Sequence, residues 1–206
     1  MRVFVFELGQ LTPALLARLQ DALPPERRAQ AERCRHESAR AAKAVSYHLL
    51  RLAAAGLGVD LPQTDWAHTE CGKPYVAGAS LHFSLSHTAD AVAVAISTHT
   101  PIGVDIEQIR PHGTGFLNKY FSEQEQKTVA AAPDAEAMLT KLWCAKEAEG
   151  KRTGSGLGGS IADIPTTDTA TATLTLGGTL HAIAVAPSAL IAPVLVSAAE
   201  LENFLQ

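Results

Sequence analysis

Several short runs of hydrophobic residues, some alternating with polar residues at a period of two and others continuously apolar, have the patterns of strands. Two of these runs flank the turn Thr88-Ala89-Asp90 and predict a hairpin, and another follows closely after it. Further runs lie in the C-terminal third of the chain. The predicted strands are residues 3–7, 81–86, 91–96, 102–107, 172–176, 179–186 and 191–197.

Capping signals and alanine-rich stretches predict helices between these runs. Thr12-Pro13 has the form of an N-cap followed by proline at the first helical position, and Pro24-Pro25 ends that helix. A helical region over residues 26–55 is predicted to break near Ser38 and to stop at Gly56. Further helices are predicted to begin at Ser122, at Pro133-Asp134 (running to about Arg152 and ending at Gly154 or Gly156) and near Ala199, whereas residues 56–65 form a loop and residues 110–115 a turn.

Helices followed by strands occur twice along the chain, which indicates an α+β protein with small antiparallel sheets. The runs 91–96 and 181–186 show similar Ala/Val alternation, which suggests two similar halves. If the repeat is real, the halves meet near Thr100-Pro101. We therefore predict an N-terminal half over residues 1–100, a C-terminal half over residues 101–206, and an active site at their junction, where sites often form.

Composition places the chain in the ordinary globular class. Of its 206 residues, 47% are hydrophobic and 18% charged, enough for a sizeable core in one large domain or two small ones. A net charge of −4 argues against a general nucleic-acid binder, although residues 27–51 are locally basic. Three cysteines without CxxC spacing, the lack of an apolar run long enough to span a membrane and an acidic residue as early as Glu7 predict a cytoplasmic protein.

Asp105 and Glu107 are two residues apart in an apolar, β-branched run. In a strand this spacing directs both side chains to one face. Two like charges on one face repel each other unless a cation offsets them, and magnesium prefers carboxylate oxygens. The alternative is an edge strand with a solvated acidic face.

Residues 143–151 are predicted to be helical, so Trp143, Glu147 and Lys151 form one stripe at i, i+4 and i+8. The plain alternative is a surface ion pair between Glu147 and Lys151, which would stabilise the helix by only ~0.3 kcal/mol. Together with Asp105 and Glu107, the stripe supplies three carboxylates and a lysine. That combination indicates a site for a hard divalent cation and a phosphate.

Two short motifs are candidates for phosphate binding. Gly72-Lys73-Pro74 is a turn that carries a cation, and Ser86-His87 places a hydroxyl beside an imidazole at the end of a strand. A plain turn is the alternative for Ser86-His87. Ser122-x-x-Glu125 has the spacing of a capping box, and this structural role is favoured over metal binding by Glu125.

In their order along the chain, these motifs resemble the phosphopantetheinyl transferase superfamily. Its two hallmark motifs have the forms (Ile/Val)-Gly-(Ile/Val)-Asp-x-Glu and Trp-x-x-Lys-Glu-Ala-x-x-Lys. The chain has Ile102-Gly103-Val104-Asp105-Ile106-Glu107 and Trp143-x-x-Lys146-Glu147-Ala148-x-x-Lys151, and Gly72-Lys73-Pro74, Phe83-Ser84-Leu85-Ser86-His87, Phe121-Ser122-x-x-Glu125 and Gly154-Ser155-Gly156-Leu157 also fit. The resemblance covers about residues 70 to 160.

The chain length is similar to that of the surfactin-synthetase-activating (Sfp) type, a monomeric pseudo-dimer of two similar halves. The short, trimeric holo-acyl-carrier-protein synthase type has one such half per chain. The resemblance implies transfer of the 4′-phosphopantetheine group from coenzyme A to a serine of an apo-carrier protein of a fatty-acid, polyketide or peptide synthetase, with magnesium as cofactor and release of adenosine 3′,5′-bisphosphate. From the net charge and the lack of a long apolar run, we expect no nucleic-acid or membrane partner.

By position, the resemblance also implies a role for each motif residue. Asp105, Glu107 and Glu147 would hold the metal, and Glu147 or a metal-bound water would take the serine proton. Lys146 and Lys151 would offset phosphate charge, with Lys151 counted among the catalytic residues. The N-terminal half would contact the nucleotide, with Ser86 and His87 at the 3′-phosphate, Lys73 and Pro74 at the adenine nucleotide, and contacts from Arg40 and Arg51.

Two departures from the family pattern leave alternatives open. Glu149-Gly150 stands where the family often has bulkier apolar residues, so the helix turn there is expected to be looser. The simplest interpretation of the arginines in residues 27–51 is that they lie on a solvated helix surface. A coenzyme A- or nucleotide-binding module without transferase activity is the alternative function, and a magnesium-dependent phosphoesterase is a poorer one.

Overall fold

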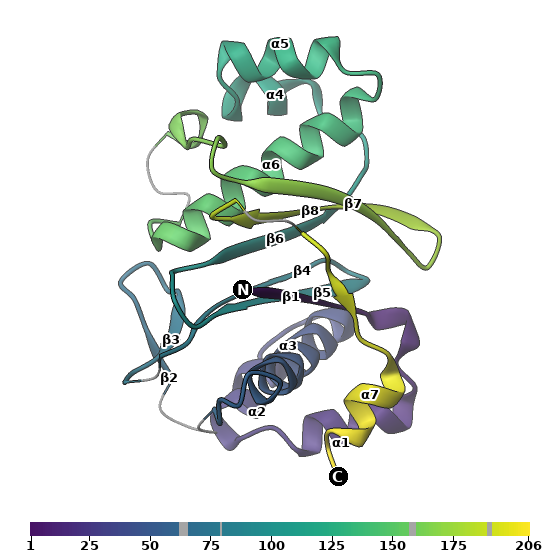
Figure 1. Ribbon diagram of the computed structural model, residues 1–206. Coiled ribbons are helices and arrows are strands. Elements are labelled where there is room, and N and C mark those ends of the chain that lie inside the picture. The colour runs from purple at the N-terminus through teal and green to yellow at the C-terminus, as the bar shows by residue number, and fades with distance from the viewer. Residues whose placement is uncertain (62–65, 79, 157–159, 189–190) are drawn as a thin grey trace.

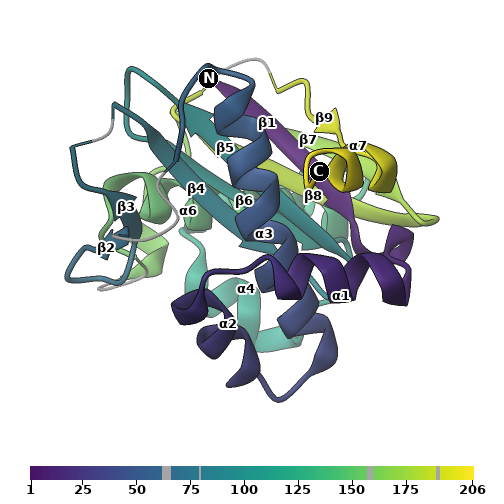
Figure 2. The ribbon, with the colours of Figure 1, turned by 90° about the horizontal axis from the view of Figure 1, so that it is seen from below.

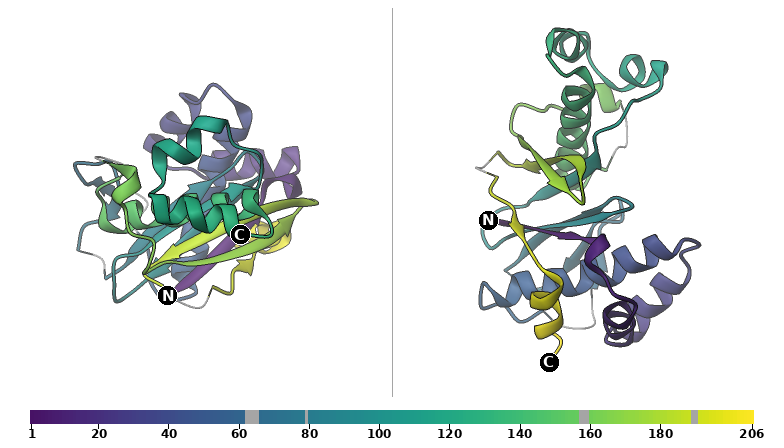
Figure 3. Two further views of the ribbon diagram at one scale, coloured as in Figure 1. Left: turned by 90° about the horizontal axis from the view of Figure 1, so that it is seen from above. Right: turned by 90° about the vertical axis from the view of Figure 1, so that its right-hand side faces the viewer.

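Four layers make up the computed structural model of the protein, which describes residues 1–61, 66–78, 80–156, 160–188 and 191–206. A long helix covers the outer face of each of two sheets, and the inner faces of these sheets pack against each other (Figure 1). The side view in Figure 3 shows the same order of layers. The α+β class predicted from the element order is confirmed.

The first part of the chain begins with a strand and continues through helices, as predicted. Thr12 caps the first helix by accepting a hydrogen bond from the Leu15 amide at 3.1 Å, and the break in the long helical region falls at residues 33–36. A short hairpin at residues 66–76 was not predicted. The elements are β1 (Arg2–Glu7), η1 (Leu8–Gln10), α1 (Pro13–Asp21), α2 (Pro25–Glu32), α3 (Glu37–Ala55), β2 (Trp66–His68), β3 (Pro74–Val76), β4 (His82–His87) and β5 (Ala91–Ser97).

The second part repeats the order of strand, helices and strands. Ser122 and Glu125 form the predicted capping box, and Gly154 ends the long helix in the left-handed conformation with φ 74°. The helix at residues 114–120 was not predicted, since only a turn was expected at residues 110–115. The elements are β6 (Gly103–Gln108), α4 (Thr114–Tyr120), α5 (Glu123–Ala131), α6 (Ala135–Thr153), η2 (Ile161–Asp163), β7 (Ala170–Leu176), β8 (Thr179–Ala186), β9 (Val194–Leu195) and α7 (Ala198–Asn203).

The described strands form a four-stranded sheet in the order β4-β5-β1-β9, a three-stranded sheet in the order β6-β8-β7, and the β2–β3 hairpin. We call the first two the N-terminal and C-terminal sheets. Alternate residues of β5 serve two cores, because its alanines face the C-terminal sheet while Val92, Val94 and Ile96 face α3. The view from below in Figure 2 shows α3 lying across the N-terminal sheet.

The last residues of the chain return to the N-terminal sheet. β9 pairs in parallel with β1, and α7 contacts α3. The division of the chain near residue 100 and the structural similarity of its two halves both stay predictions. None of the described helices is long and apolar enough to cross a membrane.

The edge strands β4 and β6 meet along a seam between the two sheets. The amides of Val104 and Ile106 donate hydrogen bonds to the hydroxyls of Ser84 and Ser86 at 3.1 Å and 3.4 Å. On its other side β6 packs directly under α6, since a Cβ added to Gly103 would lie 1.8 Å from the Ala148 carbonyl oxygen. The seam and this close approach together fix where β6 and α6 present their polar side chains.

Candidate active site

A carboxylate cluster, formed by Asp105 and Glu107 of β6 and Glu147 of α6, lies at the seam beside Lys151. Asp105 is only 3% exposed, and the Lys151 ammonium donates to its Oδ1 atom at 2.6 Å. The Ser86 hydroxyl donates to the same oxygen at 2.7 Å. β6 and α6 thus bring Asp105 and Lys151 into contact at the seam.

The cluster is short of positive charge. Burial and the neighbouring Asp105 raise the pKa of Glu107 to about 7, although Lys151 and Arg110 oppose the shift. Burial and Asp105 also raise the pKa of Glu147. Such shifts arise where carboxylates repel one another in a partly desolvated place, and an added cation would relieve the repulsion.

The second carboxylate oxygen of Asp105, Oδ2, is buried and has no hydrogen-bond partner among the described groups. A buried carboxylate oxygen without a partner is costly, so its presence fits a cation ligand. Within the described residues, however, no three carboxylate, imidazole or thiol groups are close enough together to hold a metal ion. The donor chemistry of the cluster fits a divalent cation, whereas the carboxylates do not surround one point in this structure.

The thiol of Cys144 is buried next to the cluster and donates to the Ala182 carbonyl oxygen at 3.5 Å. Burial raises the pKa of this thiol well above its usual value, and Asp105 and Glu107 add to the shift. The group is therefore a neutral thiol at pH 7, and it adds no negative charge to the cluster.

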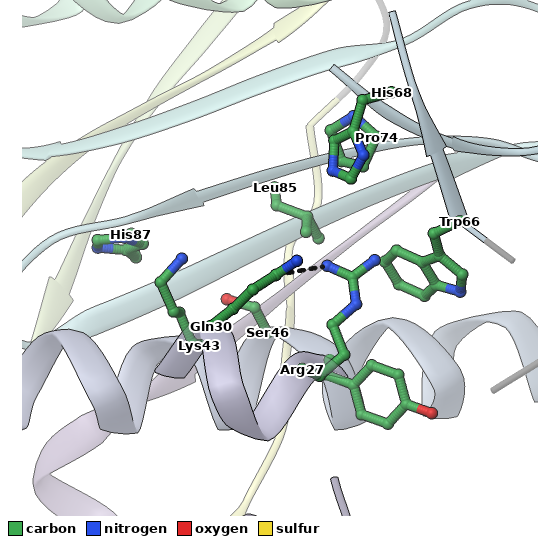
Figure 4. A pocket seen from close by; sticks show the side chains of 10 residues that line it. Arg27, Gln30, Lys43, Ser46, Trp66, His68, Pro74, Leu85 and His87 are labelled. Atoms are coloured by element: carbon green, nitrogen blue, oxygen red, sulfur yellow. Dashed lines mark hydrogen bonds between the residues drawn. The ribbon is translucent and has the colours of Figure 1, made fainter. Parts of the chain in front are cut away.

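A cationic pocket of about 270 Å³ opens on the outer side of β4, between α2, α3 and the β2–β3 hairpin. Figure 4 shows Lys43 and His87 at one side of it and Arg27 over the ring of Trp66 at the other. The Arg27 guanidinium carbon lies 3.9 Å from the centre of that ring. The pocket thus combines positive charge with aromatic surface. Its lining residues are Arg27, Gln30, Lys43, Ser46, Tyr47, Trp66, His68, Pro74, Leu85 and His87.

A glycine-lined pocket of about 220 Å³ adjoins the cationic pocket, because Pro74 and Leu85 line both. Gly150, Gly154 and Lys151 of the α6 end line one side of it. The turn that carries Lys73 lines another. The helix continues without a break past Gly150 to Thr153, and the looser turn expected at Glu149-Gly150 stays a prediction.

The ammonium of Lys73 bridges the two parts of the chain. It donates to the carbonyl oxygens of Ile102 and Arg152 at 3.1 Å and 3.3 Å, and so ties the β2–β3 hairpin to the start of β6 and the end of α6. Burial, followed by the charge of Arg152, lowers the pKa of Lys73. Pro74 lines both pockets and Lys73 lines the glycine-lined one, and their expected contact with the adenine nucleotide stays a prediction.

Ser86 and His87 do not share a target, contrary to the expectation that both meet one phosphate. Adjacent residues of a strand point to opposite faces. The Ser86 side chain faces Asp105 at the seam, whereas His87 lines the cationic pocket. Burial lowers the pKa of His87, and the charges of Lys43 and Lys151 add to this effect.

Lys146 does not reach the carboxylate cluster either, which corrects its expected role at a phosphate. Its side chain is fully buried and pairs with Glu125 at 3.0 Å. It also donates to the carbonyl oxygens of Ile161, Ala162 and Ile164, each at 3.1 Å. The direction follows from the helix, since Lys146 is about 100° around the axis from Glu147.

Arg40 is the third correction. It lines a separate cavity between α1, α2 and α3, and its guanidinium donates to the Cys34 carbonyl oxygen at 3.1 Å. The cations that do line the cationic pocket on this side are Arg27 and Lys43. Both belong to the basic stretch of residues 27–51, whose charge pattern does not indicate which helix face meets β4. Trp66 carried no sequence signal at all.

Comparison with known proteins agrees with the motif resemblance. Residues 101–191 match the sequence model of the 4′-phosphopantetheinyl transferase superfamily. The chain is 31% identical over 144 residues to a 4′-phosphopantetheinyl transferase of Bacillus subtilis, which covers 68% of this chain and 64% of that protein. It is 39% identical over 89 residues to psf-1 of Bacillus pumilus, 42% of this chain and 38% of that protein. It is 37% identical over 98 residues to AcpT of Salmonella typhimurium, which covers 45% of this chain and 51% of that protein.

The chain thus spans between 38% and 64% of the length of these relatives. The matched segment contains the whole of the C-terminal sheet with α6, and therefore all three carboxylates of the cluster and Lys151. Fold and site define an α+β protein with an acidic cluster between two packed sheets. By sequence, the chain belongs to the 4′-phosphopantetheinyl transferase superfamily.

Proposed function

We propose that the protein transfers the 4′-phosphopantetheine group of coenzyme A to a serine hydroxyl of an apo-carrier protein. The observation that carries the proposal is the carboxylate cluster beside Lys151, in which the buried Oδ2 of Asp105 lacks a partner. The names of the relatives support the same activity. Coenzyme A carries a pyrophosphate and a separate 3′-phosphate, which suits a carboxylate cluster on one side of β4 and a cationic pocket on the other.

The nucleotide end of coenzyme A is assigned to the cationic pocket. Arg27, Lys43 and His87 line it and supply charge or hydrogen-bond donors for the 3′-phosphate. Trp66 and Pro74 supply flat apolar surface for the base. The part of the substrate beyond the pyrophosphate is assigned to the glycine-lined pocket, which begins at Lys151 and adjoins the cationic pocket.

A divalent cation belongs to this proposal because the cluster needs positive charge. Asp105, Glu107 and Glu147 would hold it, since their oxygens suit magnesium and two of the three carboxylates have raised pKa values. When bound, it would supply positive charge to the pyrophosphate of coenzyme A.

In the transfer step, the serine oxygen of the carrier forms a bond to the β-phosphorus of coenzyme A. The bond from that phosphorus to the oxygen that leaves with adenosine 3′,5′-bisphosphate breaks. Glu147, or a water bound to the cation, takes the serine proton as general base. Lys151, whose side chain is 29% exposed, offsets charge on the leaving group.

The test is incubation of the protein with coenzyme A, magnesium and a panel of apo-acyl, polyketide and peptidyl carrier proteins, followed by intact-mass measurement of each carrier. One phosphopantetheinyl mass should appear on at least one carrier and should require magnesium. Binding of coenzyme A without any gain of mass on any carrier would instead favour the alternative, a coenzyme A-binding module without transferase activity.

A cytoplasmic monomer completes the proposal. The odd number of cysteines fits a reducing compartment, and the two sheets of one chain already frame the site. Sedimentation of the purified protein over a range of concentrations tests the oligomeric state.

A further inference from the structure

The hydroxyl of Ser86 contacts the charged groups of the carboxylate cluster at the seam. It donates to Asp105 Oδ1 at 2.7 Å and accepts from the Lys151 ammonium at 3.1 Å. It also accepts from the amide of Ile106, the residue between the two carboxylates of β6, at 3.4 Å. Ser86 itself is 8% exposed.

These contacts use the full hydrogen-bonding capacity of the side chain. A serine hydroxyl has one proton to donate and two lone pairs that accept. Its proton goes to Asp105, and Lys151 and Ile106 occupy both lone pairs. In this arrangement no donor is left on Ser86 for a phosphate group.

The geometry of β4 is a second, independent reason why Ser86 does not contact the 3′-phosphate. His87 follows Ser86 in β4 and therefore points to the opposite face, into the cationic pocket. A phosphate bound beside His87 would lie on the other side of β4 from the Ser86 hydroxyl.

We infer that Ser86 is a positioning residue of the metal end of the site, where it orients the Asp105 carboxylate and the Lys151 ammonium, and that it does not recognise the 3′-phosphate. The inference rests on the proposed function. With one oxygen of Asp105 held by Ser86 and Lys151, the unpartnered Oδ2 is the atom left for a cation. Loss of a group that orients a metal ligand typically weakens metal affinity about 10–100-fold.

Ser84 provides a matched control on the same strand face. Its hydroxyl accepts from the Val104 amide at 3.1 Å, so it belongs to the seam in the same way as Ser86. The described contacts of that hydroxyl include neither Asp105 nor Lys151. Ser84→Ala therefore removes a seam hydrogen bond while the oriented carboxylate is retained.

The experiment measures two affinities without any carrier protein. One measurement is the affinity for Mn²⁺, used as a paramagnetic probe of the magnesium site. The other compares the affinities for coenzyme A and dephospho-coenzyme A, which differ only in the 3′-phosphate, and is expressed as their ratio. We expect Ser86→Ala to bind Mn²⁺ about tenfold more weakly with an unchanged affinity ratio. Ser84→Ala should retain wild-type Mn²⁺ affinity, Ser86→Thr should restore it, and His87→Ala should lower the affinity ratio instead.

Two results would overturn the inference: wild-type Mn²⁺ affinity in Ser86→Ala, or a loss of preference for coenzyme A as large as that in His87→Ala. If the alanine variant does not fold, Ser86→Cys keeps the volume with a weaker donor and is read in the same way. A wild-type protein that binds Mn²⁺ and coenzyme A but modifies no carrier refutes the proposed transfer alone. A wild-type protein that binds no Mn²⁺ refutes the metal site and this inference together.

Discussion

The two sheets contribute opposite charges to the site, and they hold these charges in different ways. On the side of the N-terminal sheet, Arg27 and Lys43 project from helices α2 and α3 on long side chains into an open pocket. On the side of the C-terminal sheet, Asp105 extends from the buried strand β6 and is fixed by two hydrogen-bonding partners. The cations can adjust to a ligand, whereas the carboxylate is placed by the fold itself.

This difference matches what each end of the proposed substrate needs. A 3′-phosphate can be bound from several directions by flexible cations, because its oxygens are equivalent. A metal ligand and a general base have to be held within a fraction of an ångström of their working positions. Disturbing the C-terminal side should therefore affect chemistry and stability most, and disturbing the N-terminal side should affect mainly nucleotide affinity.

Removal of the Asp105 carboxylate should give the largest effect. We expect Asp105→Ala to lower the rate of transfer about a thousandfold, the upper range for loss of one group that stabilises a transition state. Lys151 is partly exposed, so its ammonium can turn to water and the fold should persist. Single-turnover transfer followed by intact mass measures the rate, and circular dichroism checks the fold. Near-normal transfer by a folded variant would refute the role of Asp105 as a metal ligand needed for transfer.

A methyl group at Gly103 should be the next most damaging change. The added Cβ would lie 1.8 Å from the Ala148 carbonyl oxygen, so β6 and α6 would have to separate. We expect Gly103→Ala to lower the free energy of unfolding by about 3 kcal/mol, the upper range for an overpacked core. Urea unfolding measures it. Gly113→Ala, where a Cβ meets no atom within 4 Å, is the control and should change the free energy little.

Glu125 should matter more than a helix cap alone would. It completes the capping box with Ser122 and also pairs with the fully buried ammonium of Lys146. Truncation would leave that charge with carbonyl partners only, so we expect Glu125→Ala to cost about 3 kcal/mol, the lower value for a broken buried pair. Ser122→Ala removes only the cap and should cost about 1 kcal/mol. Equal losses in the two variants, measured by urea unfolding, would contradict the structural role of the Lys146 pair.

On the cationic side, we expect Lys43→Ala to weaken coenzyme A binding about tenfold, the lower range for a hydrogen bond to a charged group. Binding of dephospho-coenzyme A should be unchanged, since it lacks the 3′-phosphate. Isothermal titration of both ligands measures the difference. Arg40→Ala serves as the matched control, because Arg40 lines another cavity. A similar loss in the Arg40 variant would restore that residue to the nucleotide site.

The smallest expected effect is a pH dependence of stability. Because the pKa of Glu107 is raised from 4.5 to about 7 in the folded protein, its contribution to stability is complete below pH 4.5 and is lost as the pH rises through 7. The metal-free melting temperature should therefore fall over this interval, and magnesium should raise it more at pH 8 than at pH 6. Differential scanning fluorimetry with EDTA or magnesium measures both slopes. Glu107→Gln should flatten the metal-free slope, and an unchanged slope would contradict the assignment.

Sequence periodicity and capping predicted most elements because these signals are local. The Ser122–Glu125 box and the glycine at residue 154 marked helix ends that the structure confirms. Helix α4 escaped prediction because it depends on contacts distant in sequence, such as the packing of Phe116 on Trp143 with ring centres 4.9 Å apart. The β2–β3 hairpin escaped prediction because each strand has only three residues, too few for a clear period-two pattern, while Lys73 in its turn is held by the distant Ile102 and Arg152.

For the site, motif spacing predicted that functional residues lie on β6 and α6. It did not predict in which direction the side chains of the other motif residues point. Ser86 and Lys146 both belong to matching motifs, yet each points away from the target that the motif suggested. In both cases one residue of displacement along a strand or helix changes the face. Arg27, Lys43 and Trp66 come from three separate elements, so only the packing of those elements on β4 brings them together.

The serine seam has a consequence for association between chains. β4 and β6 are edge strands of their sheets, and an open edge presents amides and carbonyls that can pair with a strand of another molecule. Here the hydroxyls of Ser84 and Ser86 occupy the amides of Val104 and Ile106. At this edge β6 therefore offers fewer free amides to an incoming strand, which lowers the tendency to edge-to-edge association where the active-site residues lie.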